Sequence, residues 1–293
     1  MTSLWKLIGE RIPDDHSRQV TSVYYLRQSL TAPDAPSLLV DLGCGYGESA
    51  ALTREIRPGT EWIGVDIYES EPAKTIVGEK VLLYDGVNLP FDDESIPLIY
   101  TNQVMEHVRH PEALLKDIHR VLTPGGVFIG STSQLEPYHA WSFWNYTVYG
   151  FKTIVEDAGL ILEEIRPGID GISLVQRHWF GKRQEHGAWF KRSPLNIETD
   201  QWGAETKRRP ALVNLRKLHY AGQFSYRVRK PGGASAEPGS LPASPPEAEG
   251  KPPLLLPMEP IGTPAQPPER AKPTMTGQLR RRAGRIKRRL FRR

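Results

Sequence analysis

The chain has 293 residues, with 38 Lys or Arg, 34 Asp or Glu and a formal net charge of +4. Nine of the basic residues and none of the acidic ones lie in residues 274–293, so the rest of the chain is mildly acidic. A mildly acidic body does not attract a phosphate-rich polymer, and we therefore do not expect a nucleic acid as the substrate. The single cysteine, Cys44, excludes an intramolecular disulfide, and we interpret it as a buried loop residue rather than a nucleophile. We find no signal peptide and no apolar run long enough to span a membrane, and we expect a cytoplasmic protein.

The N-terminal residues 1–35 carry apolar side chains that recur near a helical period, among them Trp5, Ile8, Val20 and Leu26. We expect this segment to be helical as far as about residue 32 because that period places the apolar side chains on one face.

A glycine-rich turn follows the first predicted strand. That strand ends in Asp41, and Gly43, Gly45 and Gly47 occupy every second position after it. Glycine tolerates positive φ and lets the backbone approach a ligand closely, while the next helix would present free N–H groups to that ligand. The dinucleotide fingerprint requires glycine where this chain has Glu48. The turn therefore favours S-adenosylmethionine, whose zwitterionic end offers an ammonium to Asp41 and a carboxylate to the loop amides.

Further signals follow this turn in chain order. Asp66 lies nineteen residues after Gly47 at the end of the second predicted strand, where an acid suits a ribose diol. The segments 80–86, 89–95 and 101–108 come next. Residues 36 to 166 together resemble the class I S-adenosylmethionine-dependent methyltransferases of type 11.

The resemblance implies a cofactor site at the ends of the strands. Asp41 and the turn would hold the amino acid end of S-adenosylmethionine, Asp66 the ribose, and Asp85 with Gly86 the adenine side. An N-terminal helical segment often covers this pocket in the family, which makes residues 1–35 a lid and Tyr24 and Tyr25 candidate lid residues. Packing on the sheet is the favoured alternative for the two tyrosines. The predicted cofactor-binding residues are Asp41, Gly43, Cys44, Gly45, Gly47, Asp66, Ile67, Asp85, Gly86, Asn102 and Gln103.

The predicted fold class is α/β, with a doubly wound, Rossmann-like, mainly parallel sheet of seven strands over residues 36–230. A helix from Pro111 precedes a fifth strand at 127–131, and Thr123 to Gly126 would stop that helix. Residues 167–222 would form an insertion between the sixth strand and the seventh. Its aromatic side chains predict an ordered helical cap rather than a loop.

The C-terminal part of the chain changes character. Residues 231–273 contain 13 prolines and predict a disordered linker. Residues 274–293 are basic, and within them 276–293 would form an amphipathic helix that binds an anionic membrane surface. The protein would then be peripheral to the inner face of the membrane. An RNA or acidic-protein contact and a solvated tail are the alternatives.

Two histidines are predicted to lie at the site of methyl transfer. Ligands bind at the carboxyl ends of parallel strands, which places His107 and His139, in the loops after the fourth and fifth strands, beside the acceptor. A hydroxyl acceptor benefits from a general base, for which His139 is the first candidate and His107 the second. A substrate contact or a structural hydrogen bond is the alternative for His139, and a structural role is favoured for His107. The histidines of residues 167–222 lack the spacing of metal ligands, and we expect no metal.

The expected function is that of a methyltransferase. The segment 136–147 around His139 resembles segments of sugar- and glycan-modifying methyltransferases, so we expect O-methylation of a sugar hydroxyl on a small or carrier-linked acceptor. One alternative is C- or N-methylation of a lipid, quinone or secondary metabolite, which needs the same cofactor residues but not His139. The other is a non-catalytic binding module tethered by the basic tail. The carboxylates of Asp41 and Asp66 argue against it, because a scaffold need not keep them.

Overall fold

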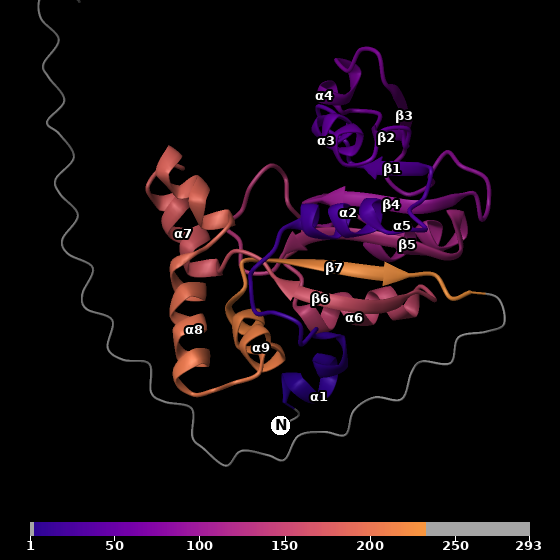
Figure 1. Ribbon diagram of the computed structural model, residues 1–293. Coiled ribbons are helices and arrows are strands. Elements are labelled where there is room, and N and C mark those ends of the chain that lie inside the picture. Colours follow the sequence, from indigo (N-terminus) through magenta and orange to yellow (C-terminus); the bar gives the residue numbers. More distant parts are fainter. Residues whose placement is uncertain (1–2, 233–293) are drawn as a thin grey trace, which may run out of the picture. The chain divides into compact units, whose positions relative to one another are not determined.

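Seven strands in the order β3-β2-β1-β4-β5-β7-β6 form one sheet in residues 3–232, the part of the chain that the computed structural model describes (Figure 1). Neighbouring strands are parallel except at β7, which runs antiparallel to β5 and to β6. The predicted doubly wound, mainly parallel α/β sheet is therefore confirmed. The strands are β1 (Leu38–Leu42), β2 (Glu61–Ile67), β3 (Lys80–Tyr84), β4 (Ile96–Asn102), β5 (Leu122–Ser133), β6 (Ile161–Pro167) and β7 (Gln223–Arg229).

Two apolar layers hold helices against the sheet. Val40 and Leu42 of β1 belong to one buried cluster and Leu39 to the other, because successive side chains of a strand point to opposite faces. The first cluster includes side chains of α1 (Leu4–Ile8), α5 (Pro111–Val121) and α6 (Val148–Asp157). The second includes side chains of α2 (Ser22–Thr31) and α3 (Glu48–Ile56). The short elements η1 (Gly9–Arg11), α4 (Glu71–Lys74) and η2 (Met105–His107) complete this part of the fold.

Helix α5 begins at Pro111, as predicted, because proline fits the first helical position. Its apolar stripe, Leu114, Leu115, Ile118 and Val121, is buried. The predicted stop at residues 123–126 is wrong, since the helix ends at Val121 and β5 already begins at Leu122. Pairing of Leu122 with Ile96 of β4 extends the strand past the glycines.

The N-terminal segment is only partly helical, so the prediction of a helix up to about residue 32 is wrong in its middle. Residues 13–21 are neither helix nor strand. They are held by tertiary contacts instead. Asp15 forms an ion pair with buried Arg166 (2.8 Å), and Gln19 Oε1 accepts hydrogen bonds from the Ser193 N–H and from Asn196 Nδ2. Such long-range partners override a helical period in the sequence.

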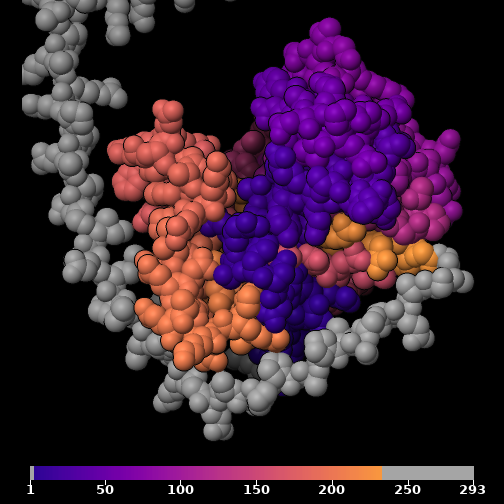
Figure 2. All heavy atoms as spheres, in the orientation of Figure 1, coloured from indigo at the N-terminus to yellow at the C-terminus, as the bar shows by residue number. Residues whose placement is uncertain are grey.

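Residues 167–222 between β6 and β7 contain α7 (Gly171–Trp179), η3 (Gln184–Phe190), α8 (Pro194–Glu205) and α9 (Pro210–Tyr220). Figure 2 shows the surface hollowed between these helices and the N-terminal half of the described chain. Within residues 3–232 no helix has the length and apolarity needed to cross a membrane. The predicted linker and basic tail lie outside the described residues, apart from the first two residues of the linker.

Candidate active site

The glycine-rich turn after β1 forms an open backbone surface. Gly43, Gly45 and Gly47 have φ of 74°, 52° and 75°, a region that side chains other than glycine rarely adopt. The Gly43 N–H donates to Val65 O (2.7 Å), which holds the turn against β2. A Cβ on Gly43 would lie 2.3 Å from Val104 Cγ2, whereas a Cβ on Gly45 would meet no atom of the described chain within 4 Å. The turn is thus packed against Val104 at Gly43, its closed side, and has free space at Gly45, its open side.

Asp66 joins the end of β2 to this turn. Its Oδ2 accepts from the Gly45 N–H (2.9 Å) and its Oδ1 from the Ile67 N–H (2.8 Å). A carboxylate offers about four lone-pair positions, so two of them stay available to a ribose diol. The Ile67 side chain is 41% exposed beside it.

Asp41 and Cys44 lie beneath the open surface. The Asp41 carboxylate is buried and accepts a hydrogen bond from the Ser49 hydroxyl, which in turn accepts from Trp62 Nε1 (2.7 Å). Burial raises the pKa of Asp41 to about 7. Burial also raises the pKa of the Cys44 thiol to about 12, which fits a structural loop residue and not a nucleophile.

The loop after β3 is organised by Asp85. Its Oδ1 accepts from the N–H groups of Val87 (2.9 Å) and Asn88 (2.7 Å), and its Oδ2 accepts from Asn88 Nδ2 (2.6 Å). These hydrogen bonds, first the one from the Asn88 side chain, lower the pKa of Asp85. Gly86 has φ of 90°, and a Cβ there would lie 3.9 Å from Ile67 Cγ2. The predicted adenine and ribose residues are therefore neighbours.

These surroundings fit S-adenosylmethionine. The open backbone at Gly45 admits a ligand where a side chain would obstruct it. Asp66 offers acceptors to the ribose, and buried Asp41 lacks a Lys or Arg within 4.0 Å among the described residues, which fits a cationic ammonium as its partner.

Asn102 and Gln103 connect the end of β4 to a pocket. Asn102 Oδ1 accepts from the hydroxyls of Ser22 (2.9 Å) and Ser131 (3.1 Å), and the side-chain amide of Gln103 lies 2.9 Å from the Ser131 hydroxyl. The pocket has a volume of about 370 Å³ and is lined by polar and apolar side chains from both halves of the described chain. Its lining residues are Val20, Thr21, Ser22, Val23, Asn102, Gln103, Ser131, Gly168, Ile169, Phe190, Gln223 and Ser225.

Tyr24 and Tyr25 pack against the protein and do not line this pocket. Tyr25 is fully buried, and its hydroxyl donates to Glu164 Oε2 (3.2 Å). The Tyr24 ring lies under the Arg166 guanidinium, 5.0 Å from it. The segment from Val20 to Val23 is the part of the N-terminus that lines the pocket.

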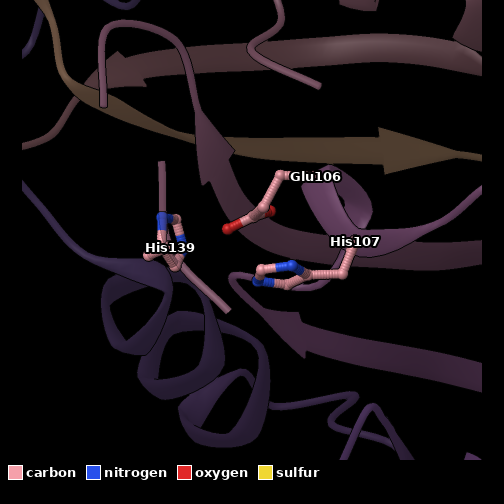
Figure 3. A group of neighbouring side chains, drawn as sticks. All are labelled: Glu106, His107 and His139. Atoms are coloured by element: carbon pink, nitrogen blue, oxygen red, sulfur yellow. The ribbon is translucent and has the colours of Figure 1, made fainter. Parts of the chain in front are cut away.

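Glu106, His107 and His139 form a cluster, called the Glu–His–His cluster below. One ligand atom of each residue lies within 4.8 Å of those of the other two. Figure 3 shows the side chains converging from η2 and from the loop after β5. The two imidazole rings meet edge to face, with centroids 5.1 Å apart. Burial, and then the charge on His139, lower the pKa of His107. The structure thus brings together the two histidines that the sequence named.

The loop that carries His139 is fixed to η2 by main-chain hydrogen bonds. Glu106 O accepts from the N–H groups of Phe143 (2.7 Å) and Trp144 (3.1 Å), and the Tyr146 hydroxyl donates to Met105 O (2.9 Å). His139 is followed by two residues with positive φ, Ala140 (37°) and Trp141 (61°). This backbone conformation is strained for residues other than glycine. His139 Nδ1 lies 3.1 Å from Pro137 O. These contacts set the position of the imidazole.

The Ser133 hydroxyl lies between two carboxylates of this region. It is 2.7 Å from Glu136 Oε2 and 3.2 Å from Glu106 Oε1, and Thr132 Oγ1 donates to Glu106 Oε2 (2.9 Å). Glu106 is fully buried. Burial first, and then repulsion by Glu136, raise the pKa of Glu106 to about 7. Neither glutamate was predicted from the sequence. The signals that could have found them are the acid directly before His107 and the acid three residues before His139.

Apolar side chains are exposed around the same loop. Leu135, Tyr138, Trp141, Phe143 and Trp144 are between 45% and 83% exposed. Exposed apolar groups gathered beside a pocket mark a surface for an apolar ligand or partner.

A larger pocket of about 630 Å³ lies at the amino-terminal ends of β4 and β5. Its lining also includes Glu163, Arg227 and Arg229. Ligands of open α/β sheets bind at the carboxyl ends of the strands, where the 370 Å³ pocket lies. We therefore place the active site at the smaller pocket.

Part of the chain is similar to a known protein family. Residues 40–130 match the protein family described as "Methyltransferase domain". These residues contain the glycine-rich turn, Asp66, Asn102 and Glu106.

Three relatives illustrate the range of similar proteins. An uncharacterised 37.1 kDa protein in transposon TN4556 of Streptomyces fradiae is 34% identical over 119 residues, which is 38% of this chain and 34% of that protein. A phthiotriol/phenolphthiotriol dimycocerosates methyltransferase of Mycobacterium tuberculosis is 30% identical over 31% of this chain and 35% of its own length. A demethylmenaquinone methyltransferase of Staphylococcus aureus is 29% identical over 62% of this chain and 70% of its own length.

The matched part of this chain spans 34% to 41% of the length of the first relatives, so the similarity concerns the domain and not those whole proteins. The fold and the family match agree with the predictions of a class I methyltransferase and of its cofactor. Residues 40–130 match a methyltransferase domain, and the sheet has the class I fold, which together support an enzyme whose cofactor is S-adenosylmethionine.

Proposed function

We propose that the protein transfers the methyl group of S-adenosylmethionine to a hydroxyl oxygen of a small or carrier-linked acceptor, with a sugar hydroxyl as the first class to test. The observation that carries this proposal is the Glu–His–His cluster in the loops after β4 and β5. Methylation of oxygen requires that the hydroxyl lose its proton, and a positioned imidazole or carboxylate contributes to that step.

When bound, S-adenosylmethionine supplies an electrophilic methyl group on sulfur. The residues of the chain have three tasks around it. The glycine-rich turn and Asp66 hold the cofactor, and the pocket beside Asn102 orients the acceptor and excludes water. His139 accepts the hydroxyl proton at Nε2, because its Nδ1 can donate to Pro137 O and so hold the hydrogen of the neutral ring.

A second candidate is methylation of a lipid or quinone at carbon or nitrogen. Two of the similar proteins are named for a demethylmenaquinone and for a mycobacterial lipid, the phthiotriol dimycocerosates. The exposed apolar side chains from Leu135 to Trp144 also favour an acceptor with a large apolar part. This candidate needs no general base at His139.

An acceptor panel tests the two candidates. The full-length protein is incubated with methyl-labelled S-adenosylmethionine and with nucleotide sugars, glycolipids and quinones in separate reactions. Label recovered on oxygen of a sugar supports the first proposal. Label recovered only on carbon or nitrogen overturns it in favour of the second, and the methylated atom is identified by NMR of the product.

A further inference from the structure

We propose that the Glu–His–His cluster binds a divalent first-row transition-metal cation, which in turn holds the oxygen of the acceptor. The metal site is new to this chain and opposes the sequence-based expectation of no metal. Only its role toward the acceptor rests on the proposed function.

The geometry of the three side chains suits one ion. Two groups bound about 2.1 Å from the same ion lie at most about 4.2 Å apart. The ligand atoms of Glu106, His107 and His139 lie within 4.8 Å of one another, so small side-chain rotations bring them to a common ion. Two imidazoles and one carboxylate leave further coordination positions for water and for an acceptor oxygen.

The second set of contacts is also typical of a metal site. A metal-binding histidine usually donates its other ring N–H to a carbonyl or carboxylate, which fixes the ring and its tautomer. His139 Nδ1 lies 3.1 Å from Pro137 O, which leaves Nε2 as the lone-pair atom. Glu106 is oriented by the hydroxyls of Thr132 (2.9 Å) and Ser133 (3.2 Å). His107 Nδ1 is buried and has no hydrogen-bond partner among the described residues.

The charges around the cluster give an independent argument for a cation. Ser133 has one hydroxyl hydrogen but lies within hydrogen-bond distance of the carboxylates of both Glu106 (3.2 Å) and Glu136 (2.7 Å). In residues 3–232 neither glutamate has a Lys or Arg nitrogen within 4.0 Å, and the ion-pair distance that Glu136 makes is 3.9 Å, from its Oε1 to His139 Nδ1. The Glu106 side chain is fully buried and that of Glu136 is 14% exposed, so their charges are poorly solvated. Buried carboxylates are normally paired or bound to a metal.

The ligand set selects the class of ion. Imidazole nitrogen suits Zn²⁺, Co²⁺, Fe²⁺ and other first-row ions, while Mg²⁺ prefers oxygen ligands and retains several waters. We therefore expect Mn²⁺ and Co²⁺ to serve as probes and Mg²⁺ to bind more weakly. Gln103 lines the pocket, and its side-chain amide lies 3.0 Å from Glu106 Oε1, so an ion at the cluster would lie near the pocket. The ion would draw electron density from an acceptor hydroxyl. With Nε2 of His139 bound to the ion, the hydroxyl proton leaves to water and not to His139.

Metal binding is measured without acceptor or cofactor. The full-length protein is freed of metal with EDTA, exchanged into buffer, and titrated with Mn²⁺ by electron paramagnetic resonance and with Co²⁺ by its visible spectrum. We expect one equivalent to bind. His139→Ala should weaken that binding by about tenfold or more, since ligand removal should cost at least as much as the loss of an outer contact.

The matched control is His178→Ala, which removes an exposed histidine of α7 and should leave the affinity unchanged. Glu106→Gln is a second variant of similar shape that removes the charge, and circular dichroism checks that each variant is folded. The absence of stoichiometric Mn²⁺ and Co²⁺ binding, or equal binding by folded His139→Ala, overturns the metal site.

The two proposals fail separately. A protein that binds Mn²⁺ at the cluster but methylates only carbon or nitrogen keeps the metal site and loses the hydroxyl acceptor. A protein that binds no Mn²⁺ or Co²⁺ and methylates a hydroxyl at full rate in EDTA loses the metal site and keeps the acceptor.

Discussion

The imidazole rings of His107 and His139 lie edge to face, 5.1 Å apart, although they belong to loops that follow different strands. Hydrogen bonds from Phe143 and Trp144 to Glu106 O hold these loops together. The two fixed loops thus bring both imidazoles together at the carboxyl ends of β4 and β5.

His139→Ala should lower the rate of methyl transfer to a hydroxyl by roughly 10²- to 10⁴-fold, the usual effect of losing a positioned proton acceptor. The affinity for S-adenosylmethionine should stay unchanged, because the glycine-rich turn and Asp66 are not touched. Steady-state rates and cofactor calorimetry measure the two effects. A variant with near-normal turnover on a hydroxyl acceptor would contradict the role of His139.

S-adenosylmethionine, or its demethylated product, should raise the melting midpoint, and NAD should not. A ligand at one hundred times its dissociation constant stabilises the native state by about 2.7 kcal/mol, which corresponds to roughly 5 to 10 °C for a domain of this size. Differential scanning fluorimetry with each ligand measures the shift. Equal stabilisation by NAD would exclude the proposed mode of cofactor binding.

Asp66→Ala should weaken cofactor binding by about ten- to a hundredfold, because hydrogen bonds from ribose hydroxyls to a carboxylate are worth about 1.5 to 3 kcal/mol. Asp92→Ala, which removes an exposed acid from the loop before β4, serves as the matched control. Calorimetry gives both affinities. Unchanged affinity in a folded Asp66→Ala protein would move the ribose site elsewhere.

Cofactor binding should release a proton from Asp41. The pKa of this buried carboxyl is raised to about 7, so about half of the molecules are protonated at pH 7 and nearly all at pH 5.5. A cationic ammonium beside it would lower that pKa, so the release should be larger at pH 6 than at pH 7. Calorimetry with the demethylated product, in buffers of different ionisation enthalpy, counts the protons. Asp41→Asn should abolish the release. If the wild-type protein releases no proton, the ammonium of the cofactor does not lie beside Asp41.

The stability of the free protein should change with pH for the same reason. Because the pKa of Asp41 is higher in the folded chain than in the unfolded chain, its contribution is complete below about pH 4 and is lost as the pH rises through 7. Asp41→Asn should therefore gain stability relative to wild type between pH 5 and pH 8. Urea unfolding at pH 5 and pH 8 measures the difference in unfolding free energy between the variant and the wild type. A difference that is the same at both pH values would contradict the raised pKa.

Gly43→Ala and Gly45→Ala should separate stability from binding. Both glycines have positive φ, which costs an alanine about 1 to 2 kcal/mol, but only at position 43 would the new Cβ collide, at 2.3 Å from Val104 Cγ2. Overpacking of this kind costs about a further 1 to 3 kcal/mol. Gly43→Ala should thus be the less stable variant, while Gly45→Ala should chiefly lose cofactor affinity. Equal unfolding free energies for the two variants would contradict the finding that the turn is tightly packed at Gly43 and open at Gly45.

The sequence by itself determined the mainly parallel sheet and the glycine-rich turn after its first strand, from which the cofactor site was predicted. Local patterns carry this information: an apolar strand before Asp41, glycines at alternate positions, and an acid at Asp66 at the end of the next strand. Each of these features depends only on the backbone preferences of nearby residues and on the spacing of apolar side chains, so the local sequence predicts it. The positions of His107 and His139 after successive strands were predicted for the same reason.

Tertiary structure alone decided the rest. The non-helical course of residues 13–21 depends on partners such as Arg166, and the early start of β5 depends on Ile96, neither of which a local period can reveal. The pairing of Glu106 with the two histidines depends on how the loop after β5 folds back onto η2. Hydrogen bonds between segments far apart in the chain fix such loops, and no short-range pattern encodes them.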